Sequence, residues 1–167
     1  MLIRAASLTS SAWRNGGGIR WGILEPEGWE LAFARIAHDG PFSDYAGQER
    51  TILLLQGRGF RLEFGDGTSL LVDRAHVPQR FDGGTPTVCR LLDGPCEVLN
   101  LMAVRKHGQP VMRVEELSAD LSGDIAAATL LAPGAVLDGE PLQVRDTVLP
   151  PARITGRATA ALVTAPR

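Results

Sequence analysis

The sequence has few of the residues that build metal or redox centres. Its histidines, His38, His76 and His107, lie far apart and show no paired spacing on any predicted strand. Because metal binding needs several ligands that converge, the sequence predicts no metal site. The two cysteines, Cys89 and Cys96, are expected to be free thiols, because a chain without secretion signals belongs in a reducing compartment.

Long apolar runs and charge of one sign are also lacking. No stretch approaches the about 18 apolar residues that span a bilayer, and residues 1–11 contain no apolar core of a signal peptide. The 17 basic and 19 acidic residues are mixed along the chain and give a net charge of −2. We therefore expect a cytoplasmic protein with no membrane contact and no nucleic-acid partner.

The chain also lacks the short motifs of common enzyme classes. It has no Gly-x-Ser-x-Gly turn for a serine nucleophile, no phosphate-binding P-loop and no dinucleotide-binding glycine motif. These absences weaken the hydrolase and nucleotide-dependent readings, and the sequence predicts no cofactor.

The chain is rich in turn-forming residues: 19 glycines and 11 prolines divide it into short apolar runs. Residues 51–56 are typical of a buried strand, and residues 60–64 alternate apolar and charged side chains as a half-buried strand does. Asp66-Gly67 then predicts a tight hairpin turn into residues 69–73, because both residue types tolerate a positive φ.

Further strands are expected on the same grounds over residues 29–36, 88–92 and 98–103. The C-terminal third gives weaker signals, and these predict strands over 111–114, 126–131, 142–149 and 158–164. Residues 126–131 are also compatible with about two helical turns. Short strands at regular spacing favour an all-β sandwich, jelly roll or barrel.

One candidate binding segment lies near the N-terminus. Trp13, Arg14, Asn15 and Gly16 begin a run that continues with two more glycines. Exposed backbone N–H groups beside a flat ring, a charge and an amide could hold a small anion or a planar ligand. The alternative is a loop in which Trp13 covers the core.

Aromatic and basic residues around the central strands form a second set of candidates. Phe42 and Ser43 precede Arg50, while Phe81 and Asp82 precede Arg90. Arginine donates two parallel N–H bonds, so a cavity lined by Arg50 and Arg90 would prefer small acids. The alternative for Arg50 is an exposed ion pair with a neighbouring acidic residue.

Asn100 lies inside an apolar strand, where a buried amide must bond to the backbone or face a ligand. Backbone bonding is the more common outcome. Cys89 has no adjacent histidine and is expected to be an inert core thiol.

Four blocks of the chain resemble the HutD/Ves family in order and spacing. They are Trp13–Gly18, Gly40–Gly47 leading to Arg50, Arg80–Gly83, and Cys89–Pro95 followed by Asn100 and Met102. The resemblance covers roughly residues 10–105. It implies an RmlC-like jelly-roll bicupin, with one cupin-like half over residues 1–105 and a second β half over residues 106–167.

The resemblance also implies a role in histidine utilisation, in which the protein limits pathway activity by binding an intermediate, or a role in stress responses. Two positions depart from the family pattern. Residues 19–22 read Ile-Arg-Trp-Gly where relatives commonly have Thr and an Arg-Glu pair, and Val98 replaces a frequent aspartate. These changes remove an acid and a hydroxyl from the expected pocket.

The sequence thus predicts a non-catalytic protein that binds a small carboxylate metabolite. The expected ligand-binding residues are Trp13, Arg14, Asn15, Gly16, Phe42, Ser43, Arg50, Phe81, Asp82, Arg90 and Asn100. A metal-independent isomerase using Asp82 or His76 is one alternative. A protein-interaction module with a flat apolar patch and no enclosed pocket is another, and an exposed edge strand is compatible with a homodimer.

Overall fold

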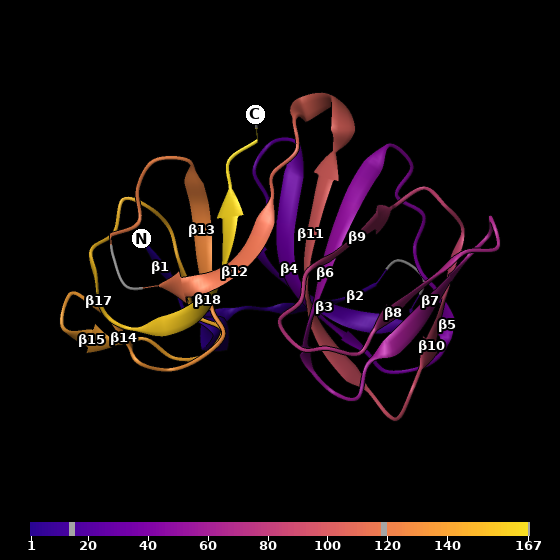
Figure 1. Ribbon diagram of the computed structural model, residues 1–167, viewed down its shortest axis with the longest axis horizontal. Helices are drawn as coiled ribbons and strands as arrows, with labels where there is room; N and C mark the ends of the chain where they lie inside the picture. The colour runs from indigo at the N-terminus through magenta and orange to yellow at the C-terminus, as the bar shows by residue number, and fades with distance from the viewer. Residues whose placement is uncertain (14–15, 118–119, 167) are drawn as a thin grey trace. The chain divides into compact units, whose positions relative to one another are not determined.

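A computed structural model of the chain describes residues 1–13, 16–117 and 120–166. Within these residues the chain is all-β, with strands joined by turns and two short 3₁₀ turns at Ala5–Ser7 and Arg105–His107 (Figure 1). The predicted fold class is confirmed. In the part of the chain that the structure describes, no helix is long and apolar enough to cross a membrane.

The chain forms two compact units. The first unit is Thr9–Gly108, and the second unit combines Met1–Leu8 with Gln109–Arg167. The predicted division at residues 105 and 106 differs from these units mainly at the N-terminus. There β1 (Leu2–Ile3) pairs with β16 (Thr147–Val148), and this pairing joins the first residues of the chain to its C-terminal part.

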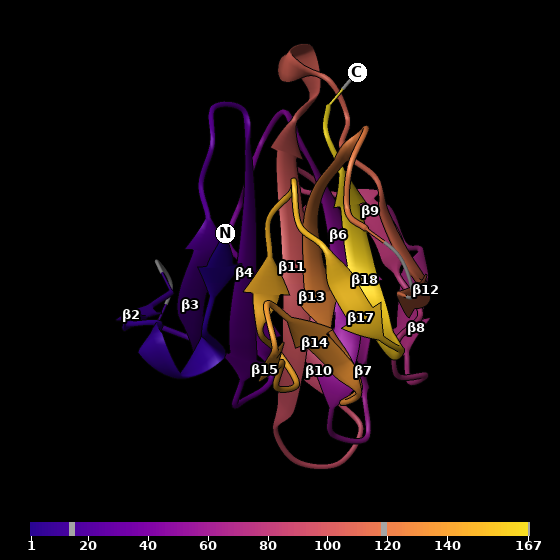
Figure 2. The same ribbon diagram turned by 90° about the vertical axis from the view of Figure 1, so that its left-hand side faces the viewer.

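The first unit consists of two antiparallel sheets. Its six-stranded sheet has the order β2 (Ser10–Ala12), β3 (Gly18–Leu24), β4 (Trp29–Ile36), β11 (Cys96–Val104), β6 (Gln48–Gln56) and β9 (Gln79–Asp82). Its four-stranded sheet has the order β5 (Gly40–Pro41), β10 (Thr87–Leu91), β7 (Phe60–Phe64) and β8 (Ser69–Val72). Figure 2 shows β3, β4 and β11 side by side from a second direction.

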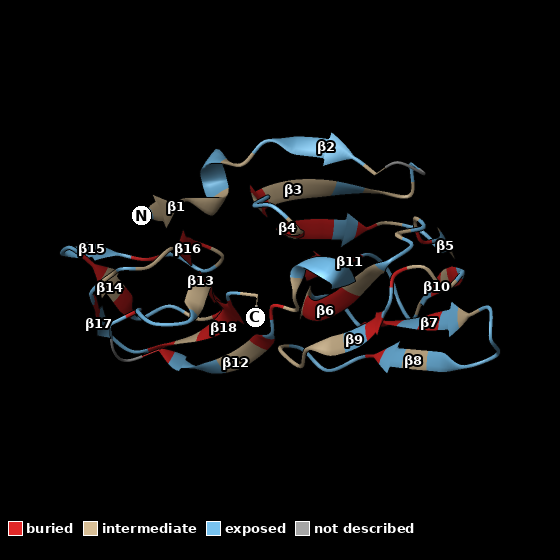
Figure 3. Cartoon of the chain, turned by 90° about the horizontal axis from the view of Figure 1, so that it is seen from above, coloured by how far each residue is buried: buried red, intermediate tan, exposed pale blue. Residues whose placement is uncertain are grey.

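The core of the first unit lies between these sheets. Alternate residues of β4, β6 and β11 point inward and meet apolar side chains of the smaller sheet. Figure 3 shows the contrast between the buried strands β4 and β6 and the largely exposed strands β2 and β8. The core residues are Ala34, Ile36, Phe42, Ile52, Leu54, Phe60, Leu62, Val72, Phe81, Cys89, Cys96 and Val98.

The second unit repeats the two-sheet plan on a smaller scale. Its five-stranded sheet has the order β1, β16, β13 (Ile125–Leu130), β18 (Ala158–Thr164) and β12 (Met112–Leu117). The other sheet has the order β15 (Glu140–Pro141), β14 (Ala135–Leu137) and β17 (Ile154–Gly156). Its core includes Leu130, Leu137, Val148, Ile154 and Leu162.

Most predicted strands are present, and one expectation needs correction. The strand predicted over residues 126–131 is confirmed as β13 (Ile125–Leu130), in which five of the six residues pair with β18 or β16. The strand predicted over 142–149 is wrong apart from Thr147–Val148. Asp146 N–H donates to the Gln143 carbonyl at 3.1 Å, and this turn ends the extended conformation.

Candidate functional site

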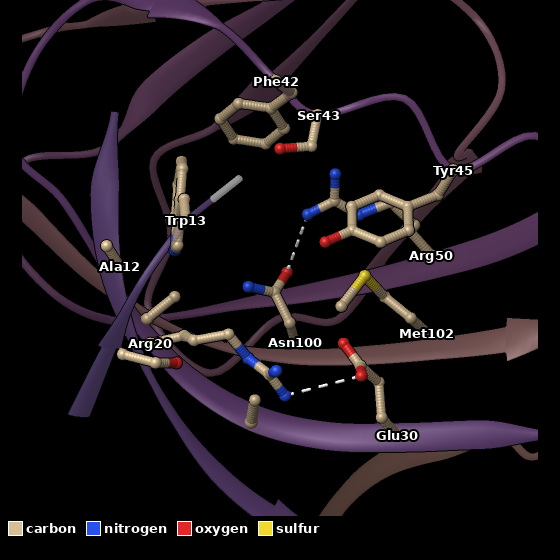
Figure 4. A pocket seen from close by; sticks show the side chains of 13 residues that line it. Ala12, Trp13, Arg20, Glu30, Phe42, Ser43, Tyr45, Arg50, Asn100 and Met102 are labelled. Carbon is tan, nitrogen blue, oxygen red and sulfur yellow. Dashed lines mark hydrogen bonds and ion pairs between the residues drawn. The ribbon is translucent and has the colours of Figure 1, made fainter. Parts of the chain in front are cut away.

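The first unit contains a cavity of about 150 Å³ at one end of its larger sheet (Figure 4). Strands β2, β3, β4, β6 and β11 contribute to it, together with the segment that follows β5. The lining residues are Ser11, Ala12, Trp13, Arg20, Glu30, Ala32, Ala34, Phe42, Ser43, Tyr45, Arg50, Asn100 and Met102.

Strand register explains why polar groups gather here. Arg50 lies opposite Met102, and Asn100 lies between Ala32 and Ile52 on the neighbouring strands. Arg50 shares the inward face of β6 with Ile52 and Leu54, because side chains two apart point the same way. That face is therefore polar at the cavity end and apolar where it joins the core.

Arg50 is the most unusual residue of the site. Only 5% of its surface is exposed, although it carries a positive charge. Its guanidinium carbon lies 5.0 Å from the ring centroid of Phe42, 5.0 Å from that of Phe81 and 5.4 Å from that of Tyr45. These rings stabilise a cation through their negative faces.

The polar contacts of Arg50 are sparse. Its Nη2 donates one long hydrogen bond of 3.5 Å to Asn100 Oδ1, and its buried Nε has no partner among the described residues. The cavity carboxylate, Glu30, lies 3.4 Å from Arg20 Nη2. Burial lowers the pKa of Arg50 to about 10, while electrostatic interactions with Tyr45 and Glu30 raise it in part. The group is therefore still a cation at neutral pH.

Arg20 and Glu30 form the other polar part of the cavity. Arg20 Nη2 lies 2.7 Å from Glu25 Oε1 and 3.4 Å from Glu30 Oε2. The Arg20 and Glu30 side chains keep 26% and 25% of their surfaces exposed, so this part of the cavity is open to solvent. Figure 4 shows Asn100 between this pair and the guanidinium of Arg50.

The segment that carries Phe42, Ser43 and Tyr45 is fixed at both ends. Phe42 N–H donates to the Thr87 carbonyl and Tyr45 N–H donates to the Gly83 carbonyl, both at 2.9 Å. A side chain at Gly83 would lie 3.2 Å from Arg50 Cγ and 3.0 Å from the Tyr45 carbonyl oxygen. Glycine at this position therefore lets the segment sit close over Arg50.

The structure brings five of the predicted binding residues into the cavity lining: Trp13, Phe42, Ser43, Arg50 and Asn100. Phe81 lies opposite Arg50 on the neighbouring strand β9, and its ring contacts the Arg50 guanidinium. Trp13 and Phe42 form an edge-to-face pair with ring centroids 5.7 Å apart. Arg14 and Asn15 lie outside the described residues.

Three predicted residues lie away from this cavity. Gly16 lines a neighbouring pocket that shares Trp13 and Phe42 with this cavity and includes Cys89, whose buried thiol has a pKa raised to about 12. Asp82 is exposed, and hydrogen bonds led by that from Arg105 lower its pKa to about 2. Arg90 is half-exposed and lies 3.3 Å from Glu63 Oε2.

Sequence reasoning missed Arg20, Glu30 and Met102 as lining residues, and it did not single out Tyr45. A signal for Glu30 was available. Glu30, Ala32 and Ala34 occupy every second position of β4, so their side chains lie on one face of the strand. On that face a charged side chain is followed by two small ones, which leaves space for a cavity. Among the described residues, no group of three or more His, Cys, Asp and Glu side chains is placed to hold a metal ion.

Comparisons with known proteins agree with this architecture. The family model described as HutD matches residues 5–153. An uncharacterized 21.2 kDa protein in the hutC 3′ region of Pseudomonas putida is 35% identical over 108 residues, which are 60% of this chain and 56% of that protein. Protein Ves of Citrobacter koseri is 29% identical over 141 residues, which are 80% of this chain and 73% of that protein.

Solved structures show the same fold. HutD from Pseudomonas fluorescens SBW25, in a formate condition, has a TM-score of 0.77 and 26% identity, covering 98% of this chain and 97% of its own. A conserved protein of unknown function from Pseudomonas aeruginosa PAO1 has a TM-score of 0.83 and 24% identity, with 100% and 98% covered. A cupin 2 barrel protein from Leptotrichia buccalis, 13% identical with 99% and 96% covered, has a TM-score of 0.61 and shares the fold alone. The fold is therefore a cupin-like jelly roll.

Proposed function

The chain belongs to the HutD family, and on that premise we propose that its first unit binds a small carboxylate-bearing metabolite in the Arg50 cavity. The observation that carries the proposal is a buried guanidinium that has an unpartnered Nε among the described residues and one long hydrogen bond, of 3.5 Å, to Asn100. An isolated buried charge is costly in free energy, and such charges are normally paired. A ligand carboxylate would supply the missing partner.

The neighbouring groups suit a carboxylate as well. The guanidinium offers a planar set of N–H donors that matches two carboxylate oxygens. Asn100, Ser43 and Tyr45 line the same space and carry further amide or hydroxyl donors. The rings of Phe42 and Phe81 lie on adjacent sides of the guanidinium and help to shield it from water.

These features favour binding over the two alternatives. Asp82 and His76, the expected acid and base of an isomerase, are not among the residues that line the cavity. An interaction module was expected to present a flat apolar patch, whereas the first unit has a cavity, partly open to solvent, that is lined by charged and polar groups. We therefore retain the non-catalytic reading.

A regulatory role in histidine utilisation is part of the proposal. The relative from Pseudomonas putida is named for its place in the hutC 3′ region, and the family itself is named HutD. A protein that binds an acidic intermediate of the pathway in the cytoplasm could report the level of that intermediate. For this reason the acidic intermediates of histidine degradation are among the ligands to be tested.

Isothermal titration calorimetry at pH 7 tests the binding step. Formate, acetate and the acidic intermediates of histidine degradation would be titrated into the wild-type protein, Arg50→Met and the control Arg61→Met. Arg61 is exposed on β7, so its substitution removes the same charge outside the cavity. We expect at least one acid to bind the wild type and control alike, and to bind Arg50→Met about 100-fold more weakly. Equal binding to Arg50→Met, or no binding of any acid, would refute the proposal.

A further inference from the structure

We propose that the ligand carries a single carboxylate and, at its other end, a neutral group that both accepts and donates a hydrogen bond, such as a primary amide. Arg50 would bind the carboxylate. Arg20 would donate a hydrogen bond to the neutral group and Glu30 would accept one from it, and the Glu30 charge would disfavour a second ligand carboxylate. This inference rests on the proposed function and specifies the class of ligand that the same cavity selects.

The charges of the lining give the first argument. Arg20 Nη2 lies 2.7 Å from Glu25 Oε1, outside the lining, so Glu25 and Glu30 together balance the charges of Arg20 and Arg50. One ligand carboxylate can pair with Arg50 and already adds a negative charge. A second carboxylate would face the Glu30 carboxylate in a partly desolvated space, where like charges repel strongly.

The geometry of the Arg20–Glu30 pair gives the second argument. Arg20 Nη2 and Glu30 Oε2 are 3.4 Å apart, which is long for a charge-assisted hydrogen bond. Arg20 Nε is buried and has no partner among the described residues. The pair therefore offers an arginine donor and a carboxylate acceptor to the same ligand group.

An amide fits such a pair because its carbonyl accepts from an arginine and its N–H donates to a carboxylate. A second ligand carboxylate could accept from Arg20 but would face the Glu30 carboxylate with no proton to donate. An apolar end would leave the Arg20 donor without a partner, which is also unfavourable.

The size and shape of the cavity are compatible with this ligand class. A volume of about 150 Å³ is comparable to cavities that hold one six-membered ring. Because Arg20 and Glu30 are partly exposed, the neutral end can reach solvent without enlarging the cavity.

Succinamate and succinate provide a matched pair of probes, since they differ only in replacing one carboxylate by an amide. Acetate serves as the probe for the Arg50 site alone. Calorimetric titrations would use the wild type, Glu30→Gln and the control Glu25→Gln. Glu25 contacts Arg20 at 2.7 Å but does not line the cavity, so its substitution removes the same charge outside the site.

We expect the wild type to bind succinamate about tenfold or more tightly than succinate. In Glu30→Gln this ratio should fall about tenfold, because the repulsion of the second carboxylate is lost, whereas Glu25→Gln should keep it within about twofold. Circular dichroism and the melting temperature check that each variant is folded.

Two failures are distinguishable. If acetate binds but the wild type does not prefer succinamate over succinate, or if Glu30→Gln keeps the wild-type ratio, the inference about the neutral end is overturned. If acetate, succinamate and succinate all fail to bind, the proposed function fails and the inference falls with it.

Discussion

Asp146 of the second unit and Arg50 of the first unit are both buried charges, with 2% and 5% of their surfaces exposed, but their surroundings differ. Asp146 accepts hydrogen bonds from Arg4 Nη1 at 2.8 Å, from the Gln143 N–H at 3.0 Å and from the Ala5 N–H at 3.1 Å. Arg50 has one bond of 3.5 Å and an unpartnered Nε. The protein satisfies the buried carboxylate, whereas the buried guanidinium keeps one donor without a partner among the described residues.

Some uncharged buried groups show the same contrast, although Thr87 of the first unit donates a hydrogen bond to the Thr85 carbonyl at 2.7 Å. In the second unit, the hydroxyls of Thr129 and Thr147 lie 2.9 Å apart on paired strands, and Thr164 Oγ1 accepts from the Val111 N–H. In the first unit, Asn100 makes only the long contact with Arg50 and faces the cavity. The comparison teaches that a buried polar side chain marks a site only when its partners are incomplete.

The largest effect is expected from Asp146→Ala, which removes the acceptor of three hydrogen bonds. Arg4 and two backbone N–H groups would lose their partner, so we expect the free energy of unfolding to fall by about 3 kcal/mol. Urea denaturation monitored by circular dichroism measures the loss.

Glu140→Ala is the matched control, because Glu140 is an exposed acidic residue of the same unit. We expect its effect to stay within about 0.5 kcal/mol. If Asp146→Ala lowered the free energy of unfolding by no more than Glu140→Ala, the hydrogen-bonded carboxylate would not stabilise the fold. The contrast drawn between Asp146 and Arg50 would then be wrong.

Arg50→Met is expected to act in the opposite direction in the absence of ligand. It replaces an incompletely partnered buried cation by an apolar side chain of similar length, so the free energy of unfolding should rise by about 1 to 2 kcal/mol. Urea denaturation without added acid measures the change, and Arg61→Met controls for the loss of charge. A clear loss of stability in Arg50→Met would mean that the contacts with the three rings outweigh the cost of burial.

Much of the fold was predictable because the patterns are local. Residues 29–36, 60–64 and 158–164 form strands with the predicted bounds, since their apolar residues alternate or run through buried positions. Strand β3 was not predicted, because Gly18 and Gly22 lower the strand propensity of this segment. Its extended conformation is stabilised by pairing with β4. The pairing of β1 with β16 joins the N-terminal residues to Thr147–Val148, and no local sequence pattern indicates it.

The site was predictable only in part. Arg50 and Asn100 stood out as polar residues in or beside apolar runs, and both line the cavity. Arg90 has the same residue type as Arg50 but points outward on β10, where it pairs with acidic residues. Residue type cannot separate these two arginines, because only the strand register decides which of them faces the cavity.

The smallest effects are expected in a double-mutant cycle on Thr129 and Thr147, which tests whether the second unit depends on mutual satisfaction of its buried hydroxyls. Thr129→Val leaves the Thr147 hydroxyl without its partner, and we expect a loss of about 1 kcal/mol in the free energy of unfolding, with the same for Thr147→Val. The double variant removes both hydroxyls and keeps two β-branched side chains, so its stability should return close to that of the wild type.

Urea denaturation of all four proteins measures the coupling. If the two single losses simply add, the hydroxyl pair does not act as a unit, and the distinction between satisfied and unsatisfied buried groups would rest on Asp146 and Arg50 alone.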